Sequence, residues 1–194
     1  MKNKKPLIKK SLELISEIGW ENFNLKLLAE KNNLEPDNLK TLFKNKWSVL
    51  KEFSIMTDQD VMNSINQNDF INNPVKDNLF EIIMMRFEKL KPYKNGILNI
   101  LNSTKKNPLI LKKISTQLFY SLDFFLEVSN AKDNFLFDKF KLSALFLIYS
   151  YVFRTWLNDD SDEMSKTMAE LDSLLSKSEL IVKNLIKTRD FRFF

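Results

Sequence analysis

One stretch, LAEKNNLEPDNLKTLFKNK between Leu28 and Lys46, constrains the fold more than any other part of the chain. It holds two short segments with apolar residues at helical spacing, and a hinge of Asn, Leu, Glu and Pro separates them. Asn33 in this hinge tolerates left-handed backbone, and Pro36 suits the first turn of a helix. The pattern is typical of two helices joined by a tight turn, a helix-turn-helix.

The segments that flank this stretch also have helical periodicity. Residues 6–18 carry apolar residues at helical spacing and end at Gly19, and Asn24 is placed to cap the helix that follows. A further helix begins near Trp47 and extends past Met56. Beyond an Asn- and Asp-rich loop at 66–74, periodicity predicts body helices at about 76–91, 93–103, 108–130, 135–157 and 162–188.

Turn-forming residues are scarce, and this scarcity bears on the fold class. The 194 residues include 2 Gly and 5 Pro, and 44% of the chain is hydrophobic, enough for a sizeable core. So few turn residues argue against a sheet of many strands. We therefore predict an all-α protein with a small three-helix, helix-turn-helix head at residues 1–54 and a larger helical body at residues 55–194.

The residue types that are absent exclude much enzyme chemistry. Without cysteine or histidine, the chain lacks disulfides, the common zinc sites, a cysteine nucleophile and the Ser-His-Asp triad. Neither Gly19 nor Gly96 lies in a phosphate-binding loop pattern. The acidic cluster from Asp159 to Glu163 precedes a helical pattern, so we expect it to cap that helix, although it could also hold a hard cation. We predict no enzyme activity, no metal and no cofactor.

Lysines are concentrated at the start of the chain. Residues 1–56 hold 11 Lys against 7 acidic residues, a net charge of +4, whereas the whole chain has a net charge of +5. The first ten residues, MKNKKPLIKK, contribute five of these lysines and no acid. Such a segment would suit a phosphate-binding arm, and it would equally suit a solvated, disordered start.

The apolar segments are short. The longest run, LSALFLIYSYVF from Leu142 to Phe153, is closed by Arg154 and is shorter than the ~20 residues that a membrane-spanning helix needs. We interpret this run as a buried helix. The lysine-rich start lacks the apolar segment and the cleavage site of a secretory signal. The sequence therefore predicts a cytoplasmic protein.

Over residues 5–53 the head resembles the DNA-binding domain of TetR-family transcriptional regulators, with no gap in the spacing. The matching positions are Ala29, Glu30, Leu34, Leu39, Phe43, Lys46 and Leu50. The resemblance implies a homodimeric regulator that binds operator DNA and responds to an apolar small molecule. It also implies DNA contacts by five residues, three lysines on phosphates and two polar residues on base edges: Lys40, Lys44, Lys46, Asn38 and Thr41.

Five positions depart from the pattern of this family. Asn33 stands where the turn glycine is usual, and Leu42 where an aromatic residue or histidine is common. Glu35 stands where a Ser or Thr cap is usual, Asp37 where a small residue is usual, and Lys40 where an aromatic residue is common. Carboxylates near phosphates are repelled unless one accepts a hydrogen bond from cytosine. The acidic start of the second helix leaves open whether DNA binding has been lost.

The body has a second, narrower resemblance. LFEIIMMRFEKLKPYKNGILNIL and VFRTWLNDDSDEMSKTMAELDSLL, with the Gly19-Trp20 pair, are similar to a TetR-like subgroup that includes the accessory protein of ubiquinone biosynthesis. This resemblance implies an alternative function, a lipid-binding accessory protein that has lost DNA binding. The tail LIVKNLIKTRDFRFF would suit that alternative, because its three phenylalanines and two arginines could meet a membrane surface: Phe191, Phe193, Phe194, Arg189 and Arg192.

Two apolar sets in the body are candidates for ligand binding and assembly. One set could line an adaptable pocket for a small molecule or lipid, or could simply form core: Met84, Met85, Phe87, Phe119, Phe124, Tyr149 and Phe153. The last predicted helix has apolar residues at alternating spacings of four and three. Together with the helix at 135–157, it predicts a four-helix dimer interface through Met164, Met168, Leu171 and Leu175.

Overall fold

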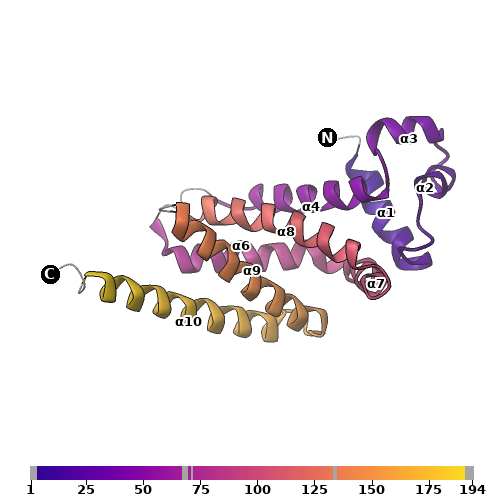
Figure 1. Cartoon of the computed structure of the whole chain (residues 1–194). Coiled ribbons are helices and arrows are strands. Elements are labelled where there is room, and N and C mark those ends of the chain that lie inside the picture. The colour runs from indigo at the N-terminus through magenta and orange to yellow at the C-terminus, as the bar shows by residue number, and fades with distance from the viewer. Residues whose placement is uncertain (1–3, 67–69, 71, 133–134, 191–194) are drawn as a thin grey trace. The chain divides into compact units, whose positions relative to one another are not determined.

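The computed structural model describes residues 4–66, 70, 72–132 and 135–190. These residues form an all-α structure without a strand, which confirms the predicted fold class (Figure 1). The chain divides into two compact units, each built from two segments. The first comprises Met1–Ser64 and Glu88–Ser121, and the second Ile65–Phe87 and Leu122–Phe194. The predicted functional boundary at residue 54 falls inside the first unit.

The first unit begins with four helices: α1 (Lys5–Ile18), α2 (Leu25–Lys31), α3 (Pro36–Leu42) and α4 (Lys46–Met62). α1 ends at Gly19, whose φ of 80° is a conformation that L side chains rarely adopt. At the start of α4, Asn45 and Ser48 form a capping box, in which each side chain bonds the backbone N–H of the other. The helices that periodicity predicts for the N-terminal part of the chain are therefore confirmed.

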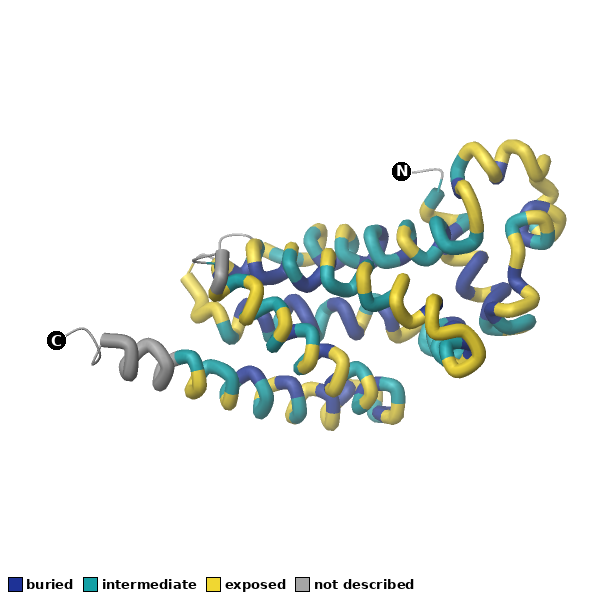
Figure 2. The backbone as a smooth tube through the Cα atoms, in the orientation of Figure 1, coloured by how far each residue is buried: buried dark blue, intermediate teal, exposed yellow. Residues whose placement is uncertain are grey.

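The same unit continues with η1 (Lys91–Tyr93), α7 (Lys94–Thr104) and the first part of α8 (Pro108–Val128). α1 packs against α7, α4 and α2. Figure 2 shows that each of these helices has buried positions alternating with exposed ones, as expected for amphipathic helices with one face in a core. α1 contributes its buried Ile8, Leu12 and Ile15 to that core.

The second unit contains most of α6 (Val75–Leu90), the end of α8, α9 (Phe135–Leu157) and α10 (Ser165–Asp190). α9 and α10 pack against each other. The core of this unit is aromatic, since the Phe87 ring centroid lies 5.1 Å from that of Tyr149 and 5.6 Å from that of Trp156. The guanidinium of the buried Arg86 lies 5.7 Å from the centroid of the Phe125 ring.

The body helices begin and end within three residues of their predicted positions. The predicted loop at 66–74 lies partly outside the described residues. Within it, Phe70 is buried and its carbonyl oxygen accepts a hydrogen bond of 2.8 Å from Asn78 Nδ2. Among the described residues, no helix is long and apolar enough to cross a membrane.

Asp159 holds the turn between α9 and α10. Its Oδ2 accepts hydrogen bonds from Thr167 N–H (2.9 Å) and Thr167 Oγ1 (2.8 Å), and its Oδ1 accepts one from Ser161 Oγ (2.6 Å). Burial raises the pKa of Asp159, but these hydrogen bonds outweigh it and hold the pKa well below its usual range. The predicted capping role is confirmed, because Thr167 lies in the first turn of α10.

The cation-binding alternative for the same cluster has no counterpart in the described part of the chain. There, no group of three or more Asp, Glu, His or Cys side chains is arranged to hold a metal ion.

Candidate nucleic-acid interface

The turn between α2 and α3 is built by hydrogen bonds at the end of α2. Asn33 has a φ of 53°, and its N–H donates to Glu30 O at 3.2 Å. The next N–H, of Leu34, donates to Ala29 O at 3.0 Å. This pair of bonds is the Schellman motif, which needs a left-handed residue that Asn tolerates. The turn that the sequence predicts at Asn33 is confirmed.

α3 is anchored by one side and presents the other to solvent. Leu39 is fully buried, and Phe43, the residue after the helix, is buried as well. Asn38 and Thr41 are exposed, and Thr41 Oγ1 donates to Asn38 O at 2.7 Å. The two predicted base-reading residues therefore share the exposed side of a short helix that follows a tight turn.

The acidic start of α3 is paired with its own lysine. Lys40 Nζ lies 2.9 Å from Asp37 Oδ1, and both side chains are exposed. This hydrogen bond and the charge of Lys40 lower the pKa of Asp37. Exposed pairs stabilise little, so Lys40 can leave Asp37 for a phosphate at small cost.

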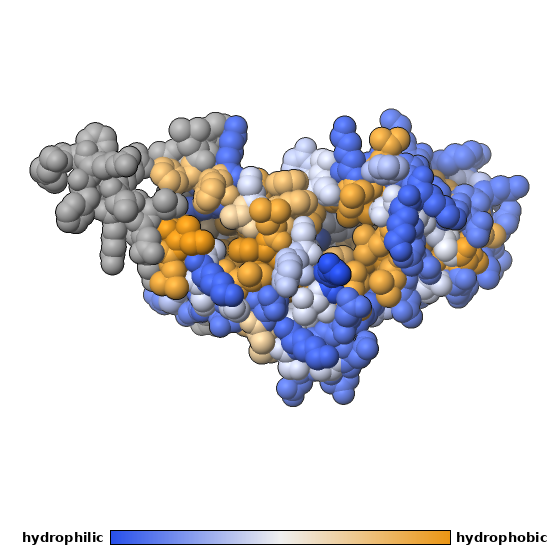
Figure 3. Space-filling view, turned by 60° about the horizontal axis from the view of Figure 1, so that its bottom comes forward, coloured by the Kyte–Doolittle hydropathy of each residue, from blue (hydrophilic) through white to orange (hydrophobic). Residues whose placement is uncertain are grey.

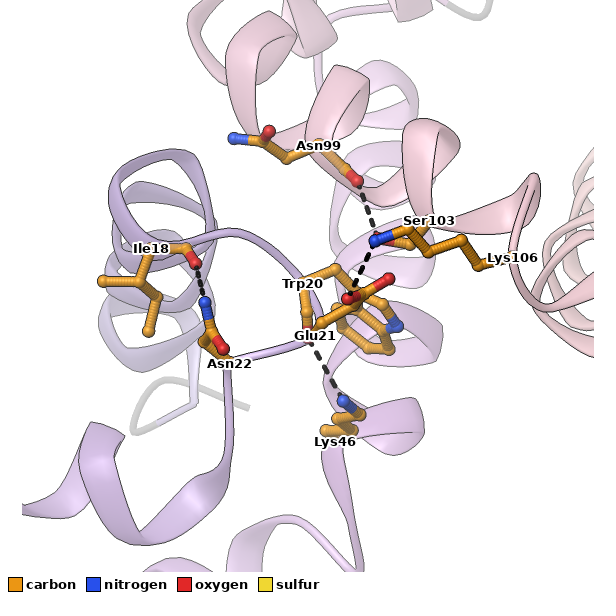
Figure 4. A network of polar contacts seen from close by, with 8 residues as sticks. All are labelled: Ile18, Trp20, Glu21, Asn22, Lys46, Asn99, Ser103 and Lys106. Carbon is orange, nitrogen blue, oxygen red and sulfur yellow. Dashed lines mark hydrogen bonds and ion pairs between the residues drawn. The ribbon is translucent and has the colours of Figure 1, made fainter.

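Lys46 is held inside the unit. Its Nζ donates to the carbonyl oxygens of Trp20 (3.1 Å) and Phe23 (3.4 Å) and lies 4.7 Å from the centroid of the Trp20 ring (Figure 4). Burial lowers the pKa of Lys46, while the charge of Glu21 raises it. Lys46 therefore ties the start of α4 to the loop between α1 and α2. A phosphate contact by Lys46, which the sequence predicts, would compete with this tie.

The lysine-rich start is not an extended arm over its described residues. α1 begins at Lys5, and the two lysines at its start pair with acids of α4. Lys4 Nζ lies 2.8 Å from Glu52 Oε1, and Lys5 Nζ lies 2.5 Å from Asp60 Oδ1. Lys44, between α3 and α4, is exposed, and it has no carboxylate partner among the residues that the structure describes.

A joint between α1 and α7 was not predicted from the sequence. Asn99 Nδ2 donates to two carbonyl oxygens near the end of α1, those of Ile15 (3.2 Å) and Ser16 (3.0 Å). At Gly96, a Cβ atom would lie 2.7 Å from Leu12 O, so only glycine allows this close approach. Figure 4 shows Asn99 and Ser103 on the same helix, where Ser103 Oγ donates a hydrogen bond to Asn99 O. A lone glycine within a helical pattern was the available signal.

The predicted pocket residues do not form one group. Phe87, Tyr149 and Phe153 stack on one another with ring centroids 5.1–6.3 Å apart, and Phe87 and Tyr149 are buried. Phe124 is exposed, whereas Met84 and Met85 are partly buried. Phe119 belongs to the first compact unit and the other predicted residues to the second. The stacked rings fill the space between them, so a ligand there would have to displace packed side chains.

Most of the predicted dimer seam is already covered within the chain. Met164, Leu171 and Leu175 are buried, and only Met168 is exposed. The large apolar side chains that are exposed in this unit include Met168, Leu180 and Ile181 on α10 and four on α9: Phe137, Phe140, Leu147 and Tyr151. Their positions follow spacings of three, seven and four, so they lie along one side of the helix. Figure 3 shows hydrophobic residues gathering in groups at the surface.

The phenylalanine-rich end of the tail, Phe191, Phe193 and Phe194 with Arg192, lies outside the described residues, and the Arg189 side chain does as well. The membrane contact predicted for this tail stays a prediction.

Comparison with known proteins identifies the fold. No protein-family model matches the sequence, and no curated protein matches it. Among solved structures, the chain is similar to the crystal structure of a TetR transcriptional regulator from Nitrosomonas europaea ATCC 19718, with a TM-score of 0.77 and 16% sequence identity. The match covers 93% of this chain and 99% of that chain, so the fold over the matched part is TetR-like. The comparisons lend no support to the narrower resemblance to the ubiquinone-biosynthesis subgroup.

Proposed function

We propose that this protein is a DNA-binding transcriptional regulator without enzyme activity. The observation that carries the proposal is a helix-turn-helix with a Schellman turn and an exposed polar side of α3, in a chain whose fold is TetR-like. In this role α3 enters the major groove, Asn38 and Thr41 meet base edges, and lysines meet phosphates. The exposed Asp37–Lys40 pair is weak enough to open when a phosphate offers Lys40 a better partner.

We further propose that the regulator is a homodimer. A helix-turn-helix dimer reads two half-sites, and each half-site adds contacts that one short helix cannot supply. The exposed apolar side of α9 supports this part of the proposal, because a partner helix could cover it. Leu171 and Leu175, which the sequence favours for the interface, would then act indirectly by fixing α10 against α9.

Control by an apolar small molecule is a separate proposal, which comes from the resemblance to TetR-family regulators. Such a ligand changes DNA affinity only if it binds the two DNA-binding states unequally. Because Phe87, Tyr149 and Phe153 stack together, a ligand that binds in this core would have to part these rings. A change in the emission of the neighbouring, buried Trp156 would report such binding.

DNA binding is tested with the purified full chain and DNA from the region upstream of its own gene. We expect a mobility shift, with an affinity that falls steeply as salt rises, because lysines displace condensed counterions from the phosphates. Excess DNA of mixed sequence should compete weakly. If the protein retains no fragment of its own genome at low salt, or if binding ignores salt, the regulator proposal is wrong.

A further inference from the structure

The compact unit that contains the helix-turn-helix is strongly basic, and most of its excess charge lies outside the helix-turn-helix. This unit holds 18 lysines against 10 acidic residues, a net charge of +8, whereas the second unit holds 12 basic and 15 acidic residues, a net charge of −3. Within the basic unit, residues 1–64 hold 11 lysines and 9 acids. Residues 88–121 hold 7 lysines and 1 acid, so they supply +6 of the +8.

Many of the lysines in the N-terminal segment lie close to a carboxylate. Five of them lie 2.5–3.9 Å from a carboxylate oxygen: Lys4, Lys5, Lys26, Lys31 and Lys40. A sixth, Lys46, directs its ammonium group at two backbone carbonyls. The N-terminal segment therefore offers fewer lysines without a nearby partner than its sequence suggests.

The lysines around the turn between α7 and α8 are not paired in this way. Lys105 follows α7, and Lys112 and Lys113 lie near the start of α8; we call these three the corner lysines. They are exposed and have no carboxylate partner in the part of the chain that the structure describes. Lys106 beside them pairs with Glu21 at 3.4 Å. The corner lysines are therefore accessible to an anionic partner.

One contact places the corner lysines next to the proposed DNA-binding helices. Lys113 Nζ lies 4.1 Å from the centroid of the Trp47 ring, and Trp47 is the second residue of α4. Lys44 lies in the connection between α3, which ends at Leu42, and α4, and Trp47 follows Lys44 by three positions. A cation over an aromatic face keeps its charge, and its other N–H groups can still donate. The start of α8 thus brings positive charge to the connection between α3 and α4.

We propose that Lys112 and Lys113, outside the helix-turn-helix, bind backbone phosphates of the DNA beside the groove that α3 enters. This inference rests on the proposed function. Phosphate contacts position a protein on the duplex without reading its sequence, so lysines from a neighbouring helix serve as well as those of the head. Exposed Leu109 and Leu111 among these lysines would also suit an anionic membrane. The Lys113–Trp47 contact beside α3 favours DNA.

The test measures binding of the full chain to a labelled mixed-sequence duplex of about 30 base pairs across a range of salt concentrations, since non-specific binding reports phosphate contacts directly. The slope of log K against log salt is negative. We expect the double variant Lys112→Gln with Lys113→Gln to make it less steep by about 1.8, or about 0.9 for each lost contact. The variant with Arg at both positions should keep the wild-type slope. Lys166→Gln with Lys177→Gln, an equal change of charge on exposed positions of α10, should leave the slope unchanged.

The outcomes separate this inference from the function on which it rests. If the wild type binds no DNA at any salt concentration, the proposed function fails and takes the inference with it. If the wild type binds DNA and the Lys112→Gln, Lys113→Gln variant keeps the wild-type slope, the inference alone is wrong.

Flotation with vesicles that contain anionic lipid tests the membrane alternative. If the double variant keeps the slope for DNA but loses a flotation that the wild type shows, the surface binds membranes and the inference is again overturned.

Discussion

Three lysines that lie close together in the sequence have different surroundings. Lys40 is hydrogen-bonded to Asp37, Lys46 donates to two carbonyl oxygens inside its unit, and Lys44 is exposed. Only Lys44 could meet a phosphate without first giving up a polar contact found among the described residues. The same residue type can therefore serve DNA binding at one position and folding at another.

This difference predicts distinct effects of matched substitutions. Lys44→Gln should make the negative slope of log K against log salt less steep by about 0.9, since one phosphate contact is lost. It should leave the melting temperature unchanged, because Lys44 is exposed. Lys46→Gln should destabilise the fold by about 1–2 kcal/mol, because two backbone carbonyls lose a charged donor. Thermal melts followed by circular dichroism, with salt titrations of DNA binding, measure both effects. Equal melting temperatures for the two variants would contradict a structural role of Lys46.

Asp159 makes a prediction about pH. Its pKa in the folded state is depressed, so the unfolded state binds the proton more readily. The stability that its charge contributes is therefore complete above an ordinary Asp pKa of about 3.9 and is lost as pH falls below it. Asp159→Asn should cost about 1–3 kcal/mol at pH 7, because an NH2 group replaces one of the two accepting oxygens and the charge is lost. The difference from wild type should shrink toward pH 3. Urea unfolding at several pH values measures this difference, and parallel curves would argue against the assignment.

At the scale of elements, α7 is fitted to α1 by the contacts of Gly96 and Asn99. Helix propensity alone predicts that Gly96→Ala stabilises α7 by about 1 kcal/mol. The structure predicts the opposite sign, because the new Cβ would lie 2.7 Å from the backbone oxygen of Leu12, and moving α7 away should cost about 1–3 kcal/mol. Asn95→Ala, at an exposed position of the same helix, is the control and should change the melting temperature little. A higher melting temperature for Gly96→Ala would refute the close packing of the two helices.

The elements themselves could be predicted from the sequence to a large extent. Helix periodicity, the Asn24 cap and the Asn33 turn depend on neighbours within a few positions, so they can be recognised locally. The hydrogen-bond partners of Lys4, Lys5 and Lys46 could not, because each lies 23 or more positions away and only tertiary packing brings it close. For the same reason, apolar periodicity in α10 did not reveal that Leu171 faces the chain's own core.

For the whole molecule, the exposed apolar side of α9 is the surface that we propose for the dimer interface. Leu147 is 68% exposed and Tyr151 is 58% exposed, one helical turn apart, whereas Leu171 is fully buried. Covering such residues is favourable, and a two-fold interface covers them on both copies at once. The position of these residues predicts that association and folding stability can be changed independently.

Leu147→Glu combined with Tyr151→Glu should therefore convert a dimer into a monomer without unfolding it, because four carboxylates would meet across the two-fold axis without partners. Light scattering at micromolar concentration measures the mass, and circular dichroism verifies the helices. Leu171→Ala should do the reverse: it should lower stability by about 2–5 kcal/mol through a cavity in the core, while the folded protein stays dimeric. A wild-type monomer, or a double variant that remains dimeric, would show that α9 does not form the interface. Loss of dimer on Leu171→Ala without loss of stability would return the interface to α10.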